Sequence, residues 1–245
     1  MEVSITGAKI YYVIPGINYP ITQTVVNAWI AMVVIVGLCI WLTRGMQVHA
    51  RTKRQVVAEM IVQMAQKLVR GNMGAKWDSF VPFIAAILSM SVVSSLMGLT
   101  GAYSPTNDLN TFLAWGILVF VLITYHKIKA NGFGGYLKGF TEPIFVMTPM
   151  NIISEIATPV SMSLRHFANI CSGYVIGLLL YAALGAVSQM IFFWLPGSLG
   201  TMPFLQVGIP AVLNVYFSVF SGCVQPYIFC MLTMQFVAQA AGTEE

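Results

Sequence analysis

One arginine stands alone in the longest apolar part of this sequence. Arg165 is the only Asp, Glu, Lys or Arg between Glu155 and Glu244. A charged side chain inside a membrane segment costs roughly 2.5–3.5 kcal/mol on insertion scales. A long side chain near a helix end can reach the interface by snorkelling, but the apolar sequence continues beyond Arg165 for more than a membrane span. We therefore favour a functional cation over a snorkelling side chain or a structural ion pair.

Polar residues accompany this arginine at helical spacing. With 3.6 residues per turn, one helix face would hold Thr158, Ser161, Arg165, Asn169 and Ser172. A second polar face, at i, i+4, i+7 and i+11, would hold Asn214, Ser218, Ser221 and Gln225. Pro226 follows directly and favours a kink beside Gln225. Two polar faces, one with a fixed cation, indicate an aqueous pathway that meets a positive gate. Glu155 is expected either near one end of such a pathway or simply at an interface.

The neighbouring residues carry weaker signals. Gly173 and Gly177 form G-x-x-x-G, for which we favour helix packing over a smooth surface against a moving partner. His166 would point about 100° away from Arg165 on a helix, which favours a packed or interfacial histidine over a proton relay. The four cysteines all lie in apolar segments, where cysteine usually packs as a small hydrophobe. We expect no cofactor, no metal site and no catalytic centre, because the motifs of soluble hydrolases and nucleotide-binding enzymes do not occur.

The composition requires a membrane environment. Only 8% of the 245 residues are charged and 58% are hydrophobic, with a mean hydropathy of +0.80. Soluble domains carry about a quarter charged residues, so lipid or other subunits must cover this chain. A helix needs roughly 20 apolar residues to cross a bilayer. The charge-poor runs predict three spans, near 22–43, 79–99 and 109–126.

The basic residues predict an orientation. Residues 44–76 hold seven of the twelve Lys and Arg residues, and 127–138 hold three more. Such loops stay on the cytoplasmic side, which places the N-terminus outside and the C-terminus in the cytoplasm. Within the first loop, apolar and charged residues alternate at helical spacing, which is typical of an amphipathic helix at the inner membrane surface. The same helix could instead dock a partner helix; a nucleic-acid site this close to two spans is not expected.

The C-terminal part is too long for ordinary spans. A helix over about 144–185 would be roughly 63 Å long at 1.5 Å per residue, about twice the hydrocarbon thickness of about 30 Å. A second long segment covers 204–241, and a glycine-rich turn at 129–139 precedes the first. The pattern leaves two architectures open: four ordinary short spans, or two long, steeply tilted helices that form a hairpin.

Two segments resemble a known family. "PVSMSLRHFANICSG", with Glu155 four residues earlier, and "VQPYIFCML" in the last segment are similar to motifs of subunit a (subunit 6) of the F-type ATP synthases. The resemblance covers the whole chain. It implies an all-α, polytopic membrane protein forming a single domain over 1–245, with three near-upright spans and a basic interfacial helix in 1–139. The tilted helical hairpin would occupy 140–245 and carry the ion-translocation residues.

The resemblance also implies a function. The chain would be the stator ion-channel subunit of a rotary ATP synthase and non-catalytic by itself. The positive-inside layout and the absence of an import presequence favour a bacterial plasma (inner) membrane, although an organelle-encoded homologue would look similar. It would contact the c-subunit ring, the b-subunit peripheral stalk and the lipid bilayer. Arg165 would face the ion-carrying carboxylate of the ring, Asn169 would neighbour it, and Gln225 would lie opposite it. The half-channels for H⁺ or Na⁺ would be lined by Glu155, Ser161, Ser172, Tyr174, Asn214, Ser218 and Ser221.

Some positions depart from the family pattern. His166 and Ala168 replace the usual Leu and Gly, and some relatives carry Glu at the position of Tyr174 and His at that of Ser218. Polar side chains with water would have to replace that charged relay, and the coupling ion stays open. The alternative function is a stand-alone transporter or channel whose intramembrane arginine binds an anionic substrate. Such transporters often contain internal repeats, and the sequence shows none.

Overall fold

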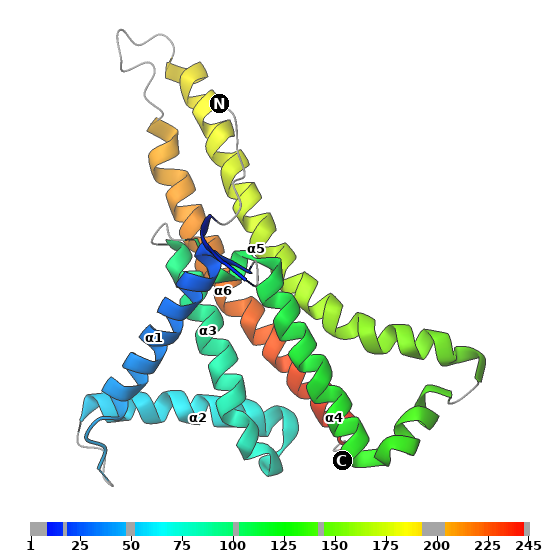
Figure 1. Cartoon of the computed structure of the whole chain (residues 1–245). Helices are drawn as coiled ribbons and strands as arrows, with labels where there is room; N and C mark the ends of the chain where they lie inside the picture. The colour runs from blue at the N-terminus through cyan, green and yellow to red at the C-terminus, as the bar shows by residue number, and fades with distance from the viewer. Residues whose placement is uncertain are drawn as a thin grey trace.

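The computed structural model describes residues 9–16, 19–47, 52–99, 103–141, 145–192 and 204–242, and these confirm an all-α membrane-type fold (Figure 1). Six helices follow an N-terminal hairpin. They are α1 (Gln23–Thr43), α2 (Lys53–Met73), α3 (Val81–Leu99), α4 (Leu109–Thr141), α5 (Thr148–Phe192) and α6 (Phe204–Ala240). Short 3₁₀ turns at Ala75–Phe80, Pro105–Asn107 and Phe145–Met147 precede α3, α4 and α5.

The hairpin was not anticipated from the sequence. Strands β1 (Ile10–Ile14) and β2 (Tyr19–Thr22) pair antiparallel, and β2 leads directly into α1. Gly16 in the connecting turn has φ 114°, a backbone conformation that residues other than glycine rarely adopt. The signal was present as a run rich in Ile, Tyr and Val around a Pro-Gly pair.

The three predicted spans correspond to α1, α3 and α4. Four described segments are long and apolar enough to cross a membrane: Gln23–Thr43, Ala75–Gly98, Leu109–Thr141 and Phe145–Ile191. The expected glycine-rich turn at 129–139 is wrong in detail. Helical structure continues to Thr141, and only Gly132 (φ 71°, ψ 166°) breaks it. The break redirects the last part of α4 away from the span (Figure 1).

The C-terminal part consists of two long helices rather than four short ones. Helix α5 has 45 residues and α6 has 37, and the two pack against each other and against α4. Helix α5 contains Pro159 and bends near its middle (Figure 1). A proline inside a helix removes one backbone hydrogen bond and is a common cause of such a bend.

Helix α2 crosses the ends of α1 and α3 instead of running beside them (Figure 1). Its inner face buries Ala58, Ala65 and Val69, whereas Met60 and Met64 are exposed. The Arg54 guanidinium lies 4.6 Å from the ring centroid of Trp41 in α1. This arrangement agrees with the expected amphipathic helix and shows that it has two apolar faces, only one of which packs on the chain.

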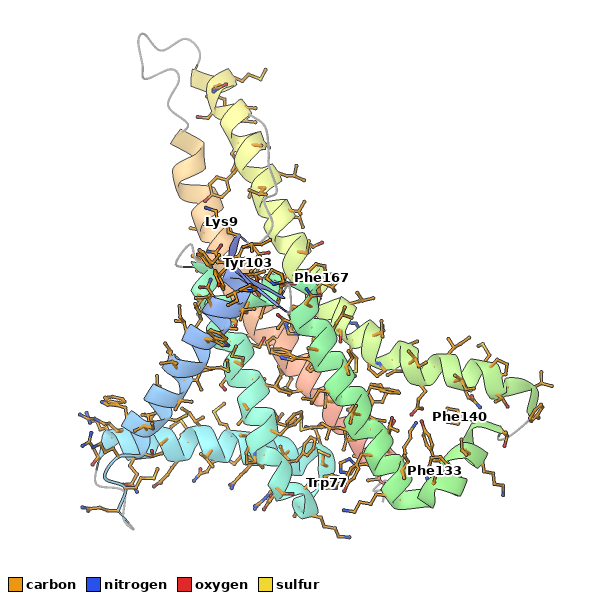
Figure 2. The ribbon with its side chains drawn as sticks, in the orientation of Figure 1. Lys9, Trp77, Tyr103, Phe133, Phe140 and Phe167 are labelled. Atoms are coloured by element: carbon orange, nitrogen blue, oxygen red, sulfur yellow. The ribbon has the colours of Figure 1, made fainter. Side chains whose placement is uncertain are left out.

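The core lies where α2, α3, α4, α5 and α6 meet. Its buried members include Val69, Ile84, Val119, Met162 and Met234, one from each of these helices. The outer faces of α1 and α5 carry many exposed apolar side chains (Figure 2). A surface of this kind is stable only against lipid or another subunit.

Candidate functional site

Helix α5 presents Arg165 on its outward face. Ser161, Arg165, Asn169 and Ser172 are all exposed, as their common stripe requires. In the described part of the chain the two ion pairs are Arg70–Asp78 and Lys127–Glu155, so Arg165 belongs to neither. The guanidinium therefore faces away from the core without a counter-charge from the described residues.

The opposite face of α5 fixes the rotation of the helix. His166 is fully buried, with its ring 4.3 Å from Phe112, 6.4 Å from Trp115 and 6.1 Å from Phe229, measured between ring centroids. Neither of its ring nitrogens has a hydrogen-bond partner among the described residues. The expectation of a packed histidine is confirmed. Since His166 follows Arg165, burial of the imidazole turns the guanidinium outward.

A second contact holds α5 close to α4. The Ser163 hydroxyl donates to the Pro159 carbonyl at 2.9 Å and lies over Gly116 of α4. A Cβ at Gly116 would be 2.1 Å from Ser163 Oγ, far inside van der Waals contact. Only glycine permits this approach, so Gly116 sets the distance between the two helices one turn from Arg165.

Helix α6 has an equivalent close contact beside Gln225. A Cβ at Gly222 would be 2.5 Å from Ser95 Cβ of α3. Pro226 is buried and Gln225 is half-buried. In the described structure no hydrogen bond joins the side chains of Gln225 and Arg165. The predicted lining side chains of Tyr174, Asn214, Ser218 and Ser221 lie outside the described part of the structure.

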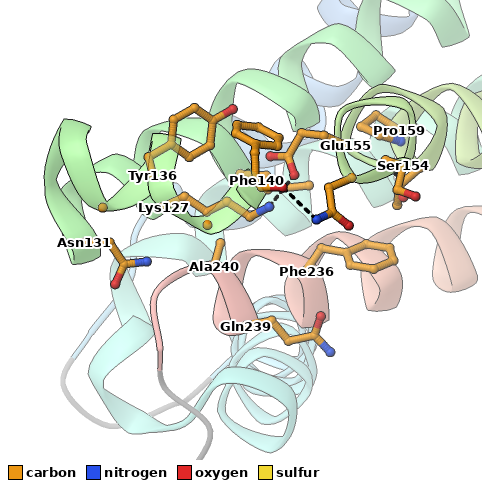
Figure 3. Close-up of a pocket in the computed structure, with 15 residues that line it drawn as sticks. Lys127, Asn131, Tyr136, Phe140, Ser154, Glu155, Pro159, Phe236, Gln239 and Ala240 are labelled. Atoms are coloured by element: carbon orange, nitrogen blue, oxygen red, sulfur yellow. Dashed lines mark hydrogen bonds and ion pairs between the residues drawn. The ribbon is translucent and has the colours of Figure 1, made fainter. Parts of the chain in front are cut away.

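Glu155 lies in a cavity and has a partner that the sequence interpretation missed. Its Oε2 accepts a hydrogen bond from Lys127 Nζ of α4, which forms an ion pair. Its Oε1 is buried without a partner among the described residues. The cavity has a volume of about 520 Å³ and lies between α4, α5 and α6 (Figure 3). Its polar lining includes Asn131, Tyr136, Ser154, Thr158 and Gln239. In the sequence, Lys127 is recognisable only as part of a basic loop, because a contact between residues 28 positions apart leaves no periodic pattern.

Two expectations from the sequence are not supported: helix packing at Gly173 and Gly177, and packing of all four cysteines. No described atom lies within 4 Å of a Cβ built on Gly173 or Gly177, so close helix packing there has no support. Of the four cysteines only Cys230 is buried, whereas Cys39, Cys171 and Cys223 are exposed. Among the described residues, no three His, Cys, Asp or Glu side chains cluster in a way that could hold a metal ion.

The fold and this site define a class: a helical, multi-pass membrane protein with an isolated cation on an outward polar face. Comparison with known proteins makes the assignment specific, because the model of the family described as "ATP synthase A chain" matches residues 25–238. The chain belongs to this family. It is 31% identical over 236 residues to ATP synthase subunit a of Desulforamulus reducens, covering 96% of this chain and 84% of that one.

Two further relatives support the assignment. ATP synthase subunit a 1 of Prosthecochloris aestuarii is 31% identical over 228 residues, covering 92% of each chain. A protein of Propionigenium modestum called "ATP synthase subunit a, sodium ion specific" is 29% identical over 244 residues, covering 93% of this chain and 77% of that one. Together with the long apolar helices, the family supports a membrane role in ATP synthesis and ion transport, and sets aside the stand-alone transporter.

Proposed function

We propose that the chain is the stator ion-channel subunit of a rotary ATP synthase and that Arg165 exchanges ions with a carboxylate on a rotating c-ring. The observation that carries this proposal is the outward, unpaired guanidinium on a polar stripe of α5. A permanent cation in an apolar region requires an anion. Since the described chain supplies none, the counter-charge arrives on another subunit.

The chemistry follows from the properties of the two groups. A ring carboxylate that faces lipid must be neutral, with a bound proton or Na⁺, because a bare anion there is costly. When it reaches Arg165, the guanidinium stays protonated and favours the ionised carboxylate. The ion is thereby released on one side, and the next ring site loads from the other. The fixed cation also repels cations that would pass directly between the two sides.

The driving force is electrical and chemical. Moving one elementary charge across 100 mV is worth about 2.3 kcal/mol, and repeated transfers past Arg165 would drive rotation in one direction. The α4–α5–α6 cavity is the candidate half-channel at the end of the molecule that carries Lys127. Ser161 and Asn169 extend the polar face on either side of Arg165. We assign Ser172, Tyr174, Asn214, Ser218, Ser221 and Gln225 to the second half-channel.

Family membership implies that the chain associates with the c-ring and the b subunits of the complex. The apolar outer faces of α1 and α5 are suited to such contacts and to lipid. The clustering of basic residues at 44–76 supports an orientation with that loop in the cytoplasm. Location in a bacterial plasma membrane, the N-terminus outside and the choice between H⁺ and Na⁺ belong to the proposal.

The decisive experiment removes the cation. We expect the complex with Arg165→Ala to assemble and to lose both ATP synthesis and ATP-driven ion pumping in proteoliposomes. Arg44→Ala is the matched control, because Arg44 is an exposed arginine at the end of α1. The control should synthesise ATP at a rate near that of the wild type. Normal ATP-driven pumping by the Arg165→Ala complex would overturn the proposal.

A further inference from the structure

The ion pair between Lys127 and Glu155 lies in the cavity between α4, α5 and α6. The Glu155 side chain is 12% exposed and that of Lys127 is 33% exposed. Both line the cavity between α4, α5 and α6, and their charged ends meet there (Figure 3). A polar cavity of about 520 Å³ is large enough to hold water.

The two carboxylate oxygens of Glu155 differ in what they contact. Oε2 accepts from Lys127 Nζ, whereas Oε1 is buried without a partner in the described structure. A buried carboxylate oxygen without a hydrogen bond is costly. Oε1 is therefore available to accept a proton or Na⁺. The other titratable groups that line the cavity are Lys127 and Tyr136 of α4, and the lining residues of α6 contribute none.

The cavity and Arg165 lie along the same helix, α5. Glu155 precedes Arg165 by ten residues, which corresponds to about 15 Å along a helix. Thr158 lines the cavity, and Ser161 is exposed on the next turn toward Arg165. Thr158 and Ser161 thus place polar side chains on α5 between Glu155 and Arg165.

We propose that Glu155 and Lys127 form a cation-release site: Glu155 Oε1 receives the monovalent cation set free near Arg165, and the Lys127 ammonium keeps that binding weak. This inference rests on the proposed function. A carboxylate alone in this cavity would hold a cation and slow its exit. The Lys127 ammonium donates to Glu155 Oε2 and repels the incoming cation. The cation therefore binds weakly at Oε1 and leaves quickly. Lys127 is thus a positioning residue that acts through Glu155.

The test measures how strongly the cation on the ATP-forming side inhibits ATP synthesis by the whole complex in proteoliposomes. One arm varies Na⁺ at fixed pH and the other varies pH without Na⁺, which identifies the cation. For Lys127→Gln we expect the half-inhibiting cation concentration to fall by about tenfold or more. The reason is that a positive charge in contact with a carboxylate lowers the affinity of that carboxylate for a cation on this scale. Lys127→Arg should behave like the wild type.

Lys129→Gln is the matched control, since it removes the same charge two residues away from an exposed position that does not line the cavity. Glu155→Gln and the double variant Lys127→Gln/Glu155→Gln should raise the half-inhibiting concentration or abolish the inhibition. If the complex with Lys127→Gln alone does not assemble, these two variants still test whether Glu155 binds the cation. Equal inhibition of Lys127→Gln and Lys129→Gln, or unchanged inhibition in Glu155→Gln, would overturn the inference. If Arg165→Ala loses coupling while one of these two outcomes is observed, the cation-release inference is wrong but the proposed function is not contradicted.

Discussion

Replacing Gly116 with alanine tests whether the contact between α4 and α5 sets the position of Arg165. The added methyl group would lie 2.1 Å from Ser163 Oγ and 3.1 Å from the Pro159 carbonyl oxygen. Pro159 lies inside α5, and its carbonyl already accepts the Ser163 hydroxyl. The Ser163 hydroxyl can rotate away only by giving up this hydrogen bond, whereas the Pro159 carbonyl cannot move without moving the helix backbone.

The size of the effect follows from this geometry. A Cβ is essentially never closer than about 3.0 Å to another heavy atom, so if Ser163 keeps its hydrogen bond, α5 must shift by about 1 Å or rotate. Overpacking of this kind lowers the free energy of unfolding by about 1–3 kcal/mol. A displacement of about 1 Å in a functional group lowers a rate by about 10²-fold. The Gly116→Ala complex should therefore synthesise ATP about 10²-fold more slowly than the wild type.

The assay is ATP synthesis in proteoliposomes, with the thermal unfolding of the purified complex measured in parallel. Gly37→Ala is the matched control, because Gly37 is exposed in α1 with nothing within 4 Å of its Cβ position. Alanine favours a helix over glycine by about 0.5–1 kcal/mol, so the control should lose neither activity nor stability. The double variant Gly116→Ala/Ser163→Ala removes the closest contact and should recover much of the activity. Equal activity of Gly116→Ala and Gly37→Ala would refute the argument.

Three further predictions use other contacts. Gly222→Ala should lower ATP synthesis, because its methyl group would meet Ser95 Cβ at 2.5 Å; normal synthesis would show that α3 and α6 can separate without displacing Gln225. His166→Leu should keep coupled synthesis and raise the free energy of unfolding by about 1–3 kcal/mol, since it removes two buried nitrogens without partners; lost coupling would instead indicate a proton relay. Asp78→Asn breaks an exposed ion pair with Arg70 and should leave thermal unfolding almost unchanged; a large loss of stability would contradict this.

Periodicity predicted the helices well, because membrane spans leave long apolar runs. The spans near 22–43, 79–99 and 109–126 appear as α1, α3 and α4. Hydropathy could not distinguish four short spans from two long helices, because Pro149 and Pro159 are compatible with either architecture. In the structure both prolines lie within α5. Pro149 is at the first turn of the helix, where its missing N–H has no consequence.

The site was predictable where it lies along one helix and unpredictable where it joins two. The exposure of Arg165, Asn169 and Ser172 follows from the helical spacing of the polar residues. The pairing of Glu155 with Lys127 does not, because it depends on how α4 and α5 pack. The same is true of Gly116, which has no unusual φ angle and is required only by the approach of Ser163.

The two faces of α5 have separate structural roles. On the inner face, Ser163 and His166 interlock with α4, and a change there must be matched by a change at Gly116 or Phe112. On the outer face, Ser161, Asn169 and Ser172 make no core contact, so their exchange leaves the fold intact. The outer polar residues can therefore be exchanged without repacking α5 against α4. The same separation makes α5 a suitable scaffold for grafting the outer polar face of one relative onto another.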